Sequence, residues 1–230
     1  MSENSIIMAA GLGTRMLPLT KTTAKPLIPV RGTPMIETVI NALNERGVSK
    51  NYIVVGYKKE QFEYLKEKYK NVEIIENKEY SEKNNISSLK AAENVLGTEN
   101  CFICEADLYI KDSSVFLPEL KQSCYFGKFI EGYSDDWIFE MKDNRIVNIK
   151  KEGTNLFNMA GISYWLKEDA AEIAKALVAA YKEPGHETLF WDEVVNRVLG
   201  KINVGVHPVK PEQIREIDTP EDLRKNENSI

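Results

Sequence analysis

The sequence predicts one α/β domain, with a mixed, mostly parallel sheet flanked by helices. Its length of 230 residues suits a single domain of this class. In the N-terminal half, apolar runs alternate with amphipathic segments, which is typical of parallel strands joined by helices. The C-terminal half instead shows hairpin patterns. We find no repeat, low-complexity segment or linker, so we expect one domain over residues 1–230.

Four apolar runs predict the strands of the parallel half, at residues 5–10, 51–56, 72–75 and 101–104. Three helical patterns lie between them. The first opens at Thr33-Pro34 and ends before Gly47, and the others cover residues 61–69 and 86–96.

The C-terminal half predicts antiparallel strands, at residues 123–130, 137–142 and 145–149, with Asp143-Asn144 as a hairpin turn. Later elements are helices at 168–181 and 191–199, a strand at 203–209, and a helix that begins at Pro220 with Thr219 as its N-cap.

The composition narrows the class of protein. The chain is 43% hydrophobic and carries a formal net charge of -5, and this mild acidity argues against a nucleic-acid partner. No apolar run approaches the roughly 20 residues of a membrane span, and the first residues lack the features of a signal peptide. Of the three cysteines, Cys101 and Cys104 stand in a predicted buried strand. We therefore expect a reduced, cytoplasmic protein without a redox or zinc site and without a membrane partner.

A glycine-rich segment, AAGLGTR, directly follows the first predicted strand. Two glycines let backbone N–H groups approach a ligand closely, which suits a polyphosphate. The segment is not a P-loop, because the spacing of that motif is absent. It is not a dinucleotide-binding fingerprint either, because Met16 stands where the third glycine is required. A simple tight turn remains the alternative.

Two cations bracket the proline-containing stretch that follows. Arg15 and Lys25 are ten residues apart and can fold back over one anionic ligand. The alternative, two solvated surface cations, is disfavoured by the order of glycine loop, arginine and Lys-Pro.

The combined pattern AAGLGTRM–PLT–KPLIPV resembles nucleotidyltransferases that join a nucleoside triphosphate to a phosphorylated small molecule. These include sugar-1-phosphate nucleotidylyltransferases and bacterial phosphocholine cytidylyltransferases, and the resemblance extends over essentially the whole chain. It implies a Rossmann-like nucleotidyltransferase fold. It also implies that Arg15 and Lys25 are catalytic and neutralise phosphate charge. The residues that it assigns to nucleotide binding in this loop are Ala10, Gly11, Gly13 and Thr14.

Two acidic sites predict a bound cation. Asp107 follows a parallel strand and should point toward the glycine loop, where a triphosphate would repel it unless Mg²⁺ lies between. In Glu216-Ile217-Asp218, an extended backbone places both carboxylates on one face and turns Ile217 inward. The resemblance implies that Asp107 and Asp218 hold the metal. A helix cap or turn is the alternative for Asp218, and it is compatible with the metal role.

The region of residues 80–89 is expected to recognise the base. It carries Asn84-Asn85 and Ser87-Ser88, as phosphocholine cytidylyltransferases do, instead of the Gly-x-(Ala/Ser) pattern of sugar-activating relatives. We expect Asn85 and Ser88 to bind the nucleotide, and CTP to be that nucleotide, because an amide offers both donor and acceptor to cytosine. A helix cap is the alternative for Asn85.

Aromatic residues beside carboxylates predict a pocket for an ammonium group. The residues expected to bind the acceptor are Asp136, Trp137, Phe190, Trp191, Asp192 and Glu216. Core packing is the alternative for Trp191. A phosphate at the other end of the acceptor could be held by Lys150 or Lys151, although a solvated surface role fits these lysines equally well.

The acceptor is therefore expected to be a zwitterion. Phosphocholine and 2-aminoethylphosphonate both fit, and the stretches CFICEADLY, YSDDWIFE, FNMAGISYW and FWDEVVN are slightly more similar to the phosphonate branch. That branch is often fused to a transaminase, which makes a transaminase a candidate partner. The expected reaction is attack of an acceptor oxygen on the α-phosphorus of CTP, with release of pyrophosphate. The rival within the family is a sugar-1-phosphate nucleotidyltransferase.

Overall fold

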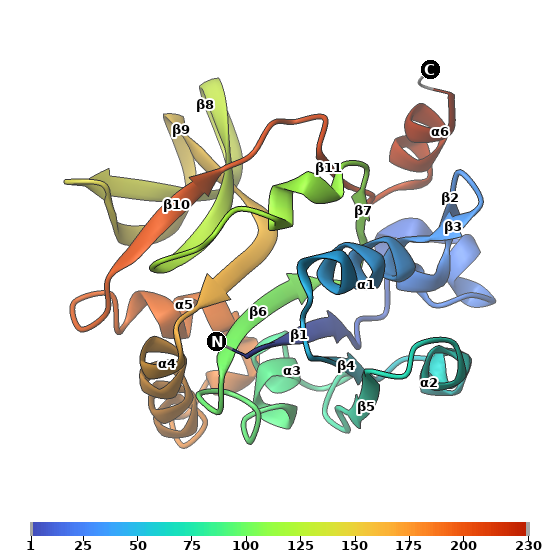
Figure 1. Cartoon of the computed structure of the whole chain (residues 1–230), viewed down its shortest axis with the longest axis horizontal. Coiled ribbons are helices and arrows are strands. Elements are labelled where there is room, and N and C mark those ends of the chain that lie inside the picture. The colour runs from blue at the N-terminus through green and yellow to red at the C-terminus, as the bar shows by residue number, and fades with distance from the viewer. Residues whose placement is uncertain (1, 229–230) are drawn as a thin grey trace.

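A seven-stranded sheet forms the centre of the computed structural model, which describes residues 2–228 (Figure 1). Its strand order is β10-β8-β9-β6-β1-β4-β5. The four strands of the N-terminal half are parallel to one another, as predicted. They are β1 (Glu3–Ala9), β4 (Lys50–Val55), β5 (Val72–Glu76) and β6 (Asn100–Glu105).

The other edge of the sheet contains a long hairpin. Strands β8 (Ser123–Lys142) and β9 (Arg145–Trp165) pair antiparallel, β9 also pairs antiparallel with β6, and β10 (Val204–Pro208) is parallel to β8. The predicted turn is confirmed, because Asp143 and Asn144 adopt φ values of 52° and 60°, as two-residue hairpin loops require. The predicted lengths were wrong: the short strands are parts of two long ones, and residues 150–165 continue β9.

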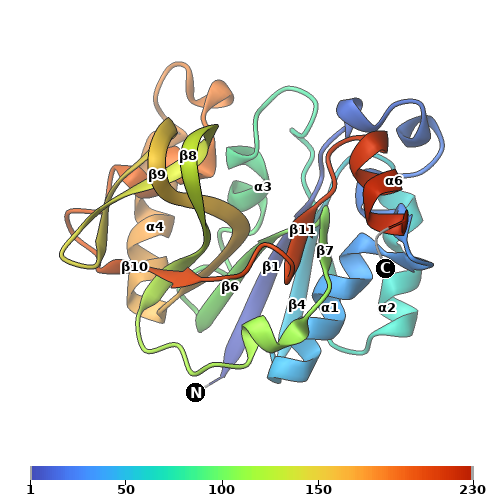
Figure 2. The same cartoon turned by 90° about the horizontal axis from the view of Figure 1, so that it is seen from above.

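Helices cover both faces of the sheet (Figures 1 and 2). Helices α1 (Met35–Arg46) and α2 (Tyr64–Lys68) pack on one face. The opposite face is covered by α3 (Ile86–Ala91), α4 (Lys167–Ala180) and α5 (Trp191–Asn196). Within β1, Ile7 faces the first layer and Ile6 the second, so the alternation along one strand supplies both cores.

Several helices are shorter than predicted. The pattern at residues 61–69 divides into the 3₁₀ helix η4 (Lys59–Phe62) and α2. The helix predicted at 86–96 ends at Ala91, because the next residues form tighter i→i+3 bonds such as that from Val95 N to Ala92 O, 2.9 Å long. Helix α5 ends at Asn196. The last helix, α6 (Pro220–Asn228), begins as predicted, and Thr219 and Asp222 cap it reciprocally.

Short elements connect the glycine loop to α1 and the sheet to α6. After β1 the chain forms η1 (Thr14–Met16), η2 (Leu19–Lys21), η3 (Lys25–Leu27) and the hairpin of β2 (Pro29–Val30) and β3 (Thr33–Pro34). A second small sheet pairs β7 (Leu108–Ile110) with β11 (Ile214–Glu216). The remaining 3₁₀ helices are η5 (Ser113–Phe116) and η6 (His186–Thr188).

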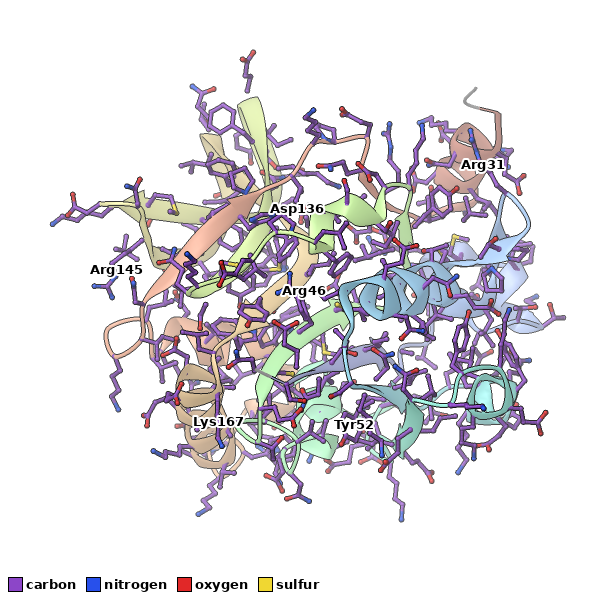
Figure 3. The ribbon with its side chains drawn as sticks, in the orientation of Figure 1. Arg31, Arg46, Tyr52, Asp136, Arg145 and Lys167 are labelled. Carbon is purple, nitrogen blue, oxygen red and sulfur yellow. The ribbon has the colours of Figure 1, made fainter. Side chains whose placement is uncertain are left out.

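Arg46, at the end of α1, joins three parts of the fold (Figure 3). Its guanidinium donates to both carboxylate oxygens of Glu3 at 2.8 and 2.9 Å, and to the carbonyl oxygens of Phe116 and Pro118. The Tyr164 hydroxyl also donates to Glu3, at 3.0 Å. This cluster fixes α1 against the start of β1 and the segment that precedes β8.

The predicted burial of Cys101 and Cys104 is confirmed. Cys101 and Cys104 lie in β6 and Cys124 in β8, all three are buried free thiols, and burial raises their pKa values. Within residues 2–228, no helix combines the length and the apolar character that a bilayer span needs.

Candidate active site

A pocket of about 480 Å³ opens at the carboxyl ends of the parallel strands. Its walls begin where β1, β5 and β6 end, which is where open α/β sheets bind ligands. Most of the predicted nucleotide and phosphate ligands therefore meet in one place. The predicted residues that line this pocket are Ala10, Gly11, Gly13, Thr14, Arg15, Lys25, Asn85, Ser88, Asp107 and Glu216.

The glycine loop packs tightly over Lys25. Gly13 has φ 63°, and a Cβ placed on it would lie 2.8 Å from Cβ of Lys25, so glycine is required there. The Thr20 hydroxyl donates to the Gly13 carbonyl oxygen at 3.0 Å and fixes the turn. By contrast, a Cβ on Gly11 would meet nothing within 4 Å, so a side chain there would point into open space.

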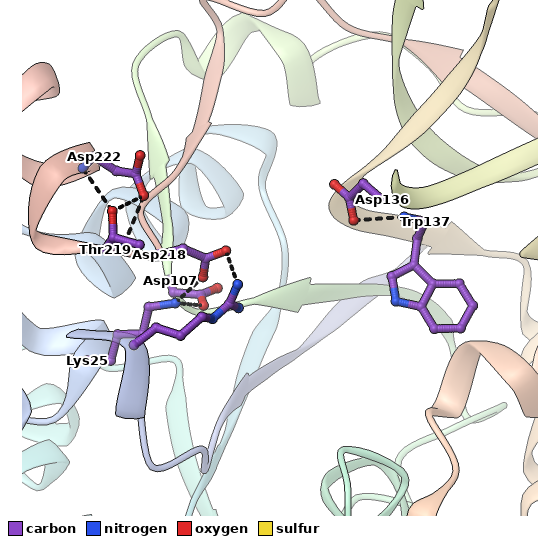
Figure 4. Close-up of polar contacts among 8 residues, drawn as sticks. Lys25, Asp107, Asp136, Trp137, Asp218, Thr219 and Asp222 are labelled. Atoms are coloured by element: carbon purple, nitrogen blue, oxygen red, sulfur yellow. Dashed lines mark hydrogen bonds and ion pairs between the residues drawn. The ribbon is translucent and has the colours of Figure 1, made fainter. Parts of the chain in front are cut away.

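Lys25 lies at the centre of the polar contacts (Figure 4). Its side chain is only 8% exposed, and Nζ donates to Oδ2 of Asp107 and to Oδ1 of Asp218, both at 2.6 Å. Burial lowers the pKa of Lys25, but the two carboxylates outweigh it and raise the pKa above its ordinary value. Arg15 Nη1 pairs with Oδ2 of Asp218 at 2.8 Å, although the Arg15 side chain is 67% exposed. Both predicted cations thus reach the same carboxylate.

Three carboxylates converge beside this lysine. Pairing of β7 with β11 sets Glu216 opposite Leu108, and oxygens of Asp107, Glu216 and Asp218 all lie within 4.8 Å of one another. Ile217 is fully buried, as predicted. Glu216, predicted to contact the acceptor, lies here with the two predicted metal ligands. Three hard oxygen donors at this spacing suit a divalent cation.

The electrostatics of the cluster favour an added cation. Glu216 keeps an exposed surface, but the protein atoms around its carboxyl desolvate it, and this desolvation, followed by the charges of Asp107 and Asp218, raises its pKa to about 8. Burial, with the charge of Asp107 next, also raises the pKa of Glu105. Burial opposes ionisation of Asp218 as well, but hydrogen bonding to Lys25 and the charges of Lys25 and Arg15 lower its pKa. Crowded carboxylates compensated by few cations attract a metal ion.

The predicted base-binding segment forms another wall of the pocket. Asn77, buried directly after β5, donates from Nδ2 to the hydroxyls of Ser87 and Ser88 at 2.9 and 3.2 Å. Asn85 stands at the N-cap position of α3, but its side chain makes no capping hydrogen bond, so the side-chain cap considered as its alternative was wrong. Its Oδ1 instead accepts a hydrogen bond from the Trp191 backbone N–H at 2.9 Å.

Comparisons with known proteins agree with this geometry. The family model described as nucleotidyl transferase matches residues 4–124. The chain belongs to this family. It is 54% identical over 221 residues to the 2-aminoethylphosphonate cytidylyltransferase of Lancefieldella rimae. The aligned region covers 96% of this chain and 90% of the relative.

A curated sequence and a solved structure from Streptococcus pneumoniae also match. The choline-phosphate cytidylyltransferase is 35% identical over 227 residues, which is 98% of this chain and 97% of the relative. A solved structure of CTP:phosphocholine cytidylyltransferase superposes with a TM-score of 0.89 at 33% identity, over 99% of this chain and 98% of that one. The predicted enzyme class and the nucleotidyltransferase fold are thereby confirmed.

In this nucleotidyltransferase, part of the predicted acceptor site lies on β8 and before α5. The ring centroids of Trp137 and Phe190 are 5.4 Å apart. Nζ of Lys151 lies 5.3 Å from the first and 5.1 Å from the second, within cation–π range of both. Asp136 is exposed and accepts from the Trp137 backbone N–H at 2.7 Å; Figure 4 shows the pair apart from the Lys25 cluster. Lys150 instead pairs with Glu140.

Trp191 and Asp192 of the nucleotidyltransferase are buried in the core. Trp191 stacks on Tyr125 with a centroid distance of 5.9 Å, which is the core packing considered as its alternative. Oδ1 of Asp192 accepts from the Tyr125 hydroxyl at 2.9 Å. Neither lines the large pocket, although Trp191 and Glu105 line a second cavity of about 10 Å³. Their contact with an acceptor stays a prediction.

Sequence reasoning did not single out four polar residues that line the pocket of this nucleotidyltransferase: Asn77, Tyr80, Lys83 and Glu105. Tyr80 and Lys83 nevertheless fall within the segment of residues 80–89 that was expected to recognise the base. Asn77 and Glu105 stand at the carboxyl ends of β5 and β6, so the rule applied to Asp107 could have found them. A Cβ on Gly56 would lie 2.6 Å from Cγ of Tyr80, so that glycine makes room for the ring.

Proposed function

We propose that this nucleotidyltransferase transfers CMP from CTP to 2-aminoethylphosphonate, giving CMP-aminoethylphosphonate and pyrophosphate. The observation that carries the choice of acceptor is the 54% identity with a 2-aminoethylphosphonate cytidylyltransferase, against 35% with a choline-phosphate enzyme. Phosphocholine is the second candidate, supported by the match to the Streptococcus pneumoniae structure along nearly the whole chain. A sugar-1-phosphate is less favoured, because the base segment lacks the pattern of sugar-activating relatives.

The geometry of the large pocket supports binding of the nucleotide. Gly11, Gly13 and Thr14 line one wall of the pocket, and we assign their backbone N–H groups to the triphosphate. Asn85 and Ser88 form the wall that we assign to the cytosine. Arg15 and Lys25 supply the positive charge next to the phosphates.

The proposed reaction needs no strong general base. A phosphonate oxygen of the acceptor is already anionic and forms the new bond to the α-phosphorus. The bond from that phosphorus to the bridging oxygen breaks, and its electron pair leaves with pyrophosphate. The chain holds two anions in line and spreads the growing negative charge through Arg15, Lys25 and backbone N–H donors.

We propose Mg²⁺ as the cofactor, held by Asp107 and Asp218 with Glu216 beside them. The fit is chemical: three carboxylates within reach of one ion, next to a loop suited to phosphate. When bound, Mg²⁺ supplies positive charge that draws phosphate oxygens together and neutralises them. Lys25 already pairs with both aspartates, which supports a cationic partner at this spot.

The aromatic pair is our candidate for the ammonium end of the acceptor. Lys151 lies within cation–π range of both Trp137 and Phe190, which supports the capacity of these rings to hold an ammonium group. Asp136 adds negative charge next to Trp137. Phe190, Trp191, Asp192 and Glu216 remain in the proposed acceptor set.

We further propose that the enzyme acts in the cytoplasm, a setting to which its three free, buried cysteines are suited. A transaminase that handles the same aminophosphonate, separate or fused, is the proposed pathway partner.

Pyrophosphate release tests the function. The purified enzyme is assayed with CTP and Mg²⁺ against 2-aminoethylphosphonate, phosphocholine, phosphoethanolamine and glucose-1-phosphate, and each acceptor is ranked by kcat/KM. We expect 2-aminoethylphosphonate to rank first and UTP to replace CTP poorly. A first place for phosphocholine supports the second candidate. Equally low activity with all three amines would refute the zwitterion pocket.

A further inference from the structure

Two segments that carry different parts of the candidate site are joined directly. Asn84 and Asn85 line the large pocket. Residues 187–191 carry Phe190, whose ring contacts Trp137. Asn85 and Trp191 are 106 positions apart in the sequence, so the contact arises only in the folded protein.

Three hydrogen bonds form this connection. The Asn84 backbone N–H donates to the Glu187 carbonyl oxygen at 2.8 Å, and Asn84 Nδ2 donates to the Thr188 carbonyl oxygen at 3.1 Å. The Trp191 backbone N–H donates to Asn85 Oδ1 at 2.9 Å. This N–H belongs to the first residue of α5, where a helix offers no internal partner. Asn85 therefore satisfies a donor that the helix leaves open.

The same bond fixes the orientation of the Asn85 amide. Its Oδ1 is used by Trp191, and Nδ2 has no partner among residues 2–228. Asn85 also lines the large pocket. The group that it leaves for a ligand is thus a donor, which matches the O2 and N3 acceptors of cytosine.

We propose that Asn85 is a positioning residue that couples the nucleotide subsite to the acceptor subsite. Its oxygen holds Trp191 and thereby sets the place of Phe190, while its Nδ2 is left for the base. A nucleotide that engages Nδ2 restrains the amide, and the restrained amide stabilises residues 187–191. The acceptor then binds more tightly after the nucleotide, and by linkage the reverse holds equally. This inference rests on the proposed function.

Two substitutions separate the two halves of the amide. Asn85→Asp keeps an oxygen for the Trp191 N–H and removes Nδ2, whereas Asn85→Ala removes both. We expect Asn85→Ala to raise the acceptor KM about five- to tenfold. Asn85→Asp keeps the bond to Trp191 and loses only the nucleotide's hold on Nδ2, so we expect it to raise the acceptor KM less, by about two- to threefold. The KM for CTP should rise in both variants. The control is Lys182→Gln, which is exposed, lies outside both joined segments and does not line the pocket, and which should change neither constant.

A second readout does not depend on turnover. Hydrogen–deuterium exchange of residues 187–193 should be faster in Asn85→Ala and unchanged in Asn85→Asp. If Asn85→Ala does not fold, Asn84→Asp replaces it, because that change breaks the bond to Thr188 and keeps the Oδ1 bond to the Asn85 N–H. Unmodified enzyme that releases no pyrophosphate would refute the proposed function, while the exchange experiment would still test the connection. Equal acceptor KM values for the two Asn85 variants, or equal exchange, would overturn this inference.

Discussion

Lys25 and Asp218 are 193 positions apart in the sequence, yet Nζ of the lysine donates to Oδ1 of the aspartate at 2.6 Å. The same ammonium donates to Asp107, which lies two residues after the end of β6. One cation therefore joins the glycine-loop segment, the central sheet and the segment before α6. The candidate site is complete only when the C-terminal segment is in place.

Asp218→Asn tests this junction. The amide preserves the shape of the side chain but removes the charge that pairs with Lys25 and Arg15 and weakens a proposed metal ligand. We expect kcat/KM to fall about 100-fold or more, and the Mg²⁺ concentration for half-maximal rate to rise, in a pyrophosphate-release assay.

Asp222→Asn is the matched control for that change. Asp222 accepts from the Thr219 backbone N–H and hydroxyl at 2.9 and 2.7 Å, so it caps α6 and does not line the pocket (Figure 4). This variant should lose about 1 kcal/mol of stability and keep its turnover. Normal turnover of Asp218→Asn would contradict the assigned role of Asp218.

Lys151 and Lys150 are adjacent in sequence but differ in environment, which makes them a matched pair. Lys151 lies over Trp137 and Phe190, and an acceptor ammonium bound there would displace it toward the phosphonate end. We expect Lys151→Met to raise the acceptor KM about tenfold or more, because a charged hydrogen bond to the acceptor is lost, with the KM for CTP unchanged. Lys150→Met breaks only the half-exposed pair with Glu140 and should alter neither constant. A lower acceptor KM for Lys151→Met would show instead that Lys151 competes with the substrate.

The parallel half of the fold was predictable because each strand is a short apolar run bounded by turn residues. The long hairpin was not, because β8 and β9 pair with repeated register shifts that interrupt the two-residue alternation. The second half of β9 also contains Asn158 and Gly161, which lower its resemblance to a strand. The alternation of apolar and polar residues that predicts a strand is therefore lost where the bulges begin, which is why only short strands were predicted there.

The candidate site divides in the same way. The glycine loop, Arg15 and Lys25 stand close together in the sequence, so their spacing alone predicted a phosphate site. The position of Glu216 depends on pairing between β7 and β11, which have three residues each and are too short to show a pattern. The bond between Asn85 and Trp191 likewise depends on tertiary packing, so the sequence left open the side-chain cap that the structure excludes.

The pair of Glu3 and Arg46, which lies far from the candidate site, should make the free energy of unfolding depend on pH. Burial raises the pKa of Glu3, but hydrogen bonds and charge from Arg46, with a bond from Tyr164, bring it below the ordinary value. A carboxyl group whose pKa is lowered by folding stabilises the folded state at pH values above its unfolded-state pKa. This stabilisation is lost as the pH falls through the folded-state pKa. Glu3→Gln should therefore cost about 1–3 kcal/mol at pH 7, and the cost should shrink below about pH 4.5.

Urea unfolding of the two proteins at several pH values measures this difference. Glu73→Gln is the control, since Glu73 forms a pair with Lys50 in which the side chains are 50% and 43% exposed. Such exposed pairs contribute little, so its unfolding free energy should stay within about 0.5 kcal/mol of the unmodified protein. A constant cost of Glu3→Gln from pH 7 to pH 3.5 would contradict the prediction.

The buried carboxyl of Asp192 should make the free energy of unfolding depend on pH in the opposite direction. Burial raises its pKa to about 7, and the hydrogen bond from Tyr125 only partly offsets that rise. The folded state therefore binds more protons than the unfolded state between about pH 4 and pH 7, so stability falls as pH rises through this range. In Asp192→Asn the amide oxygen still accepts from Tyr125, and the buried charge is absent.

The free energy of unfolding of Asp192→Asn should exceed that of the unmodified protein by about 2–4 kcal/mol at pH 8, and this gain should vanish near pH 4. Calorimetric unfolding at both pH values, with the exposed Asp135→Asn as control, measures the gain, and an equal gain at both would show that the Asp192 charge is not the cause.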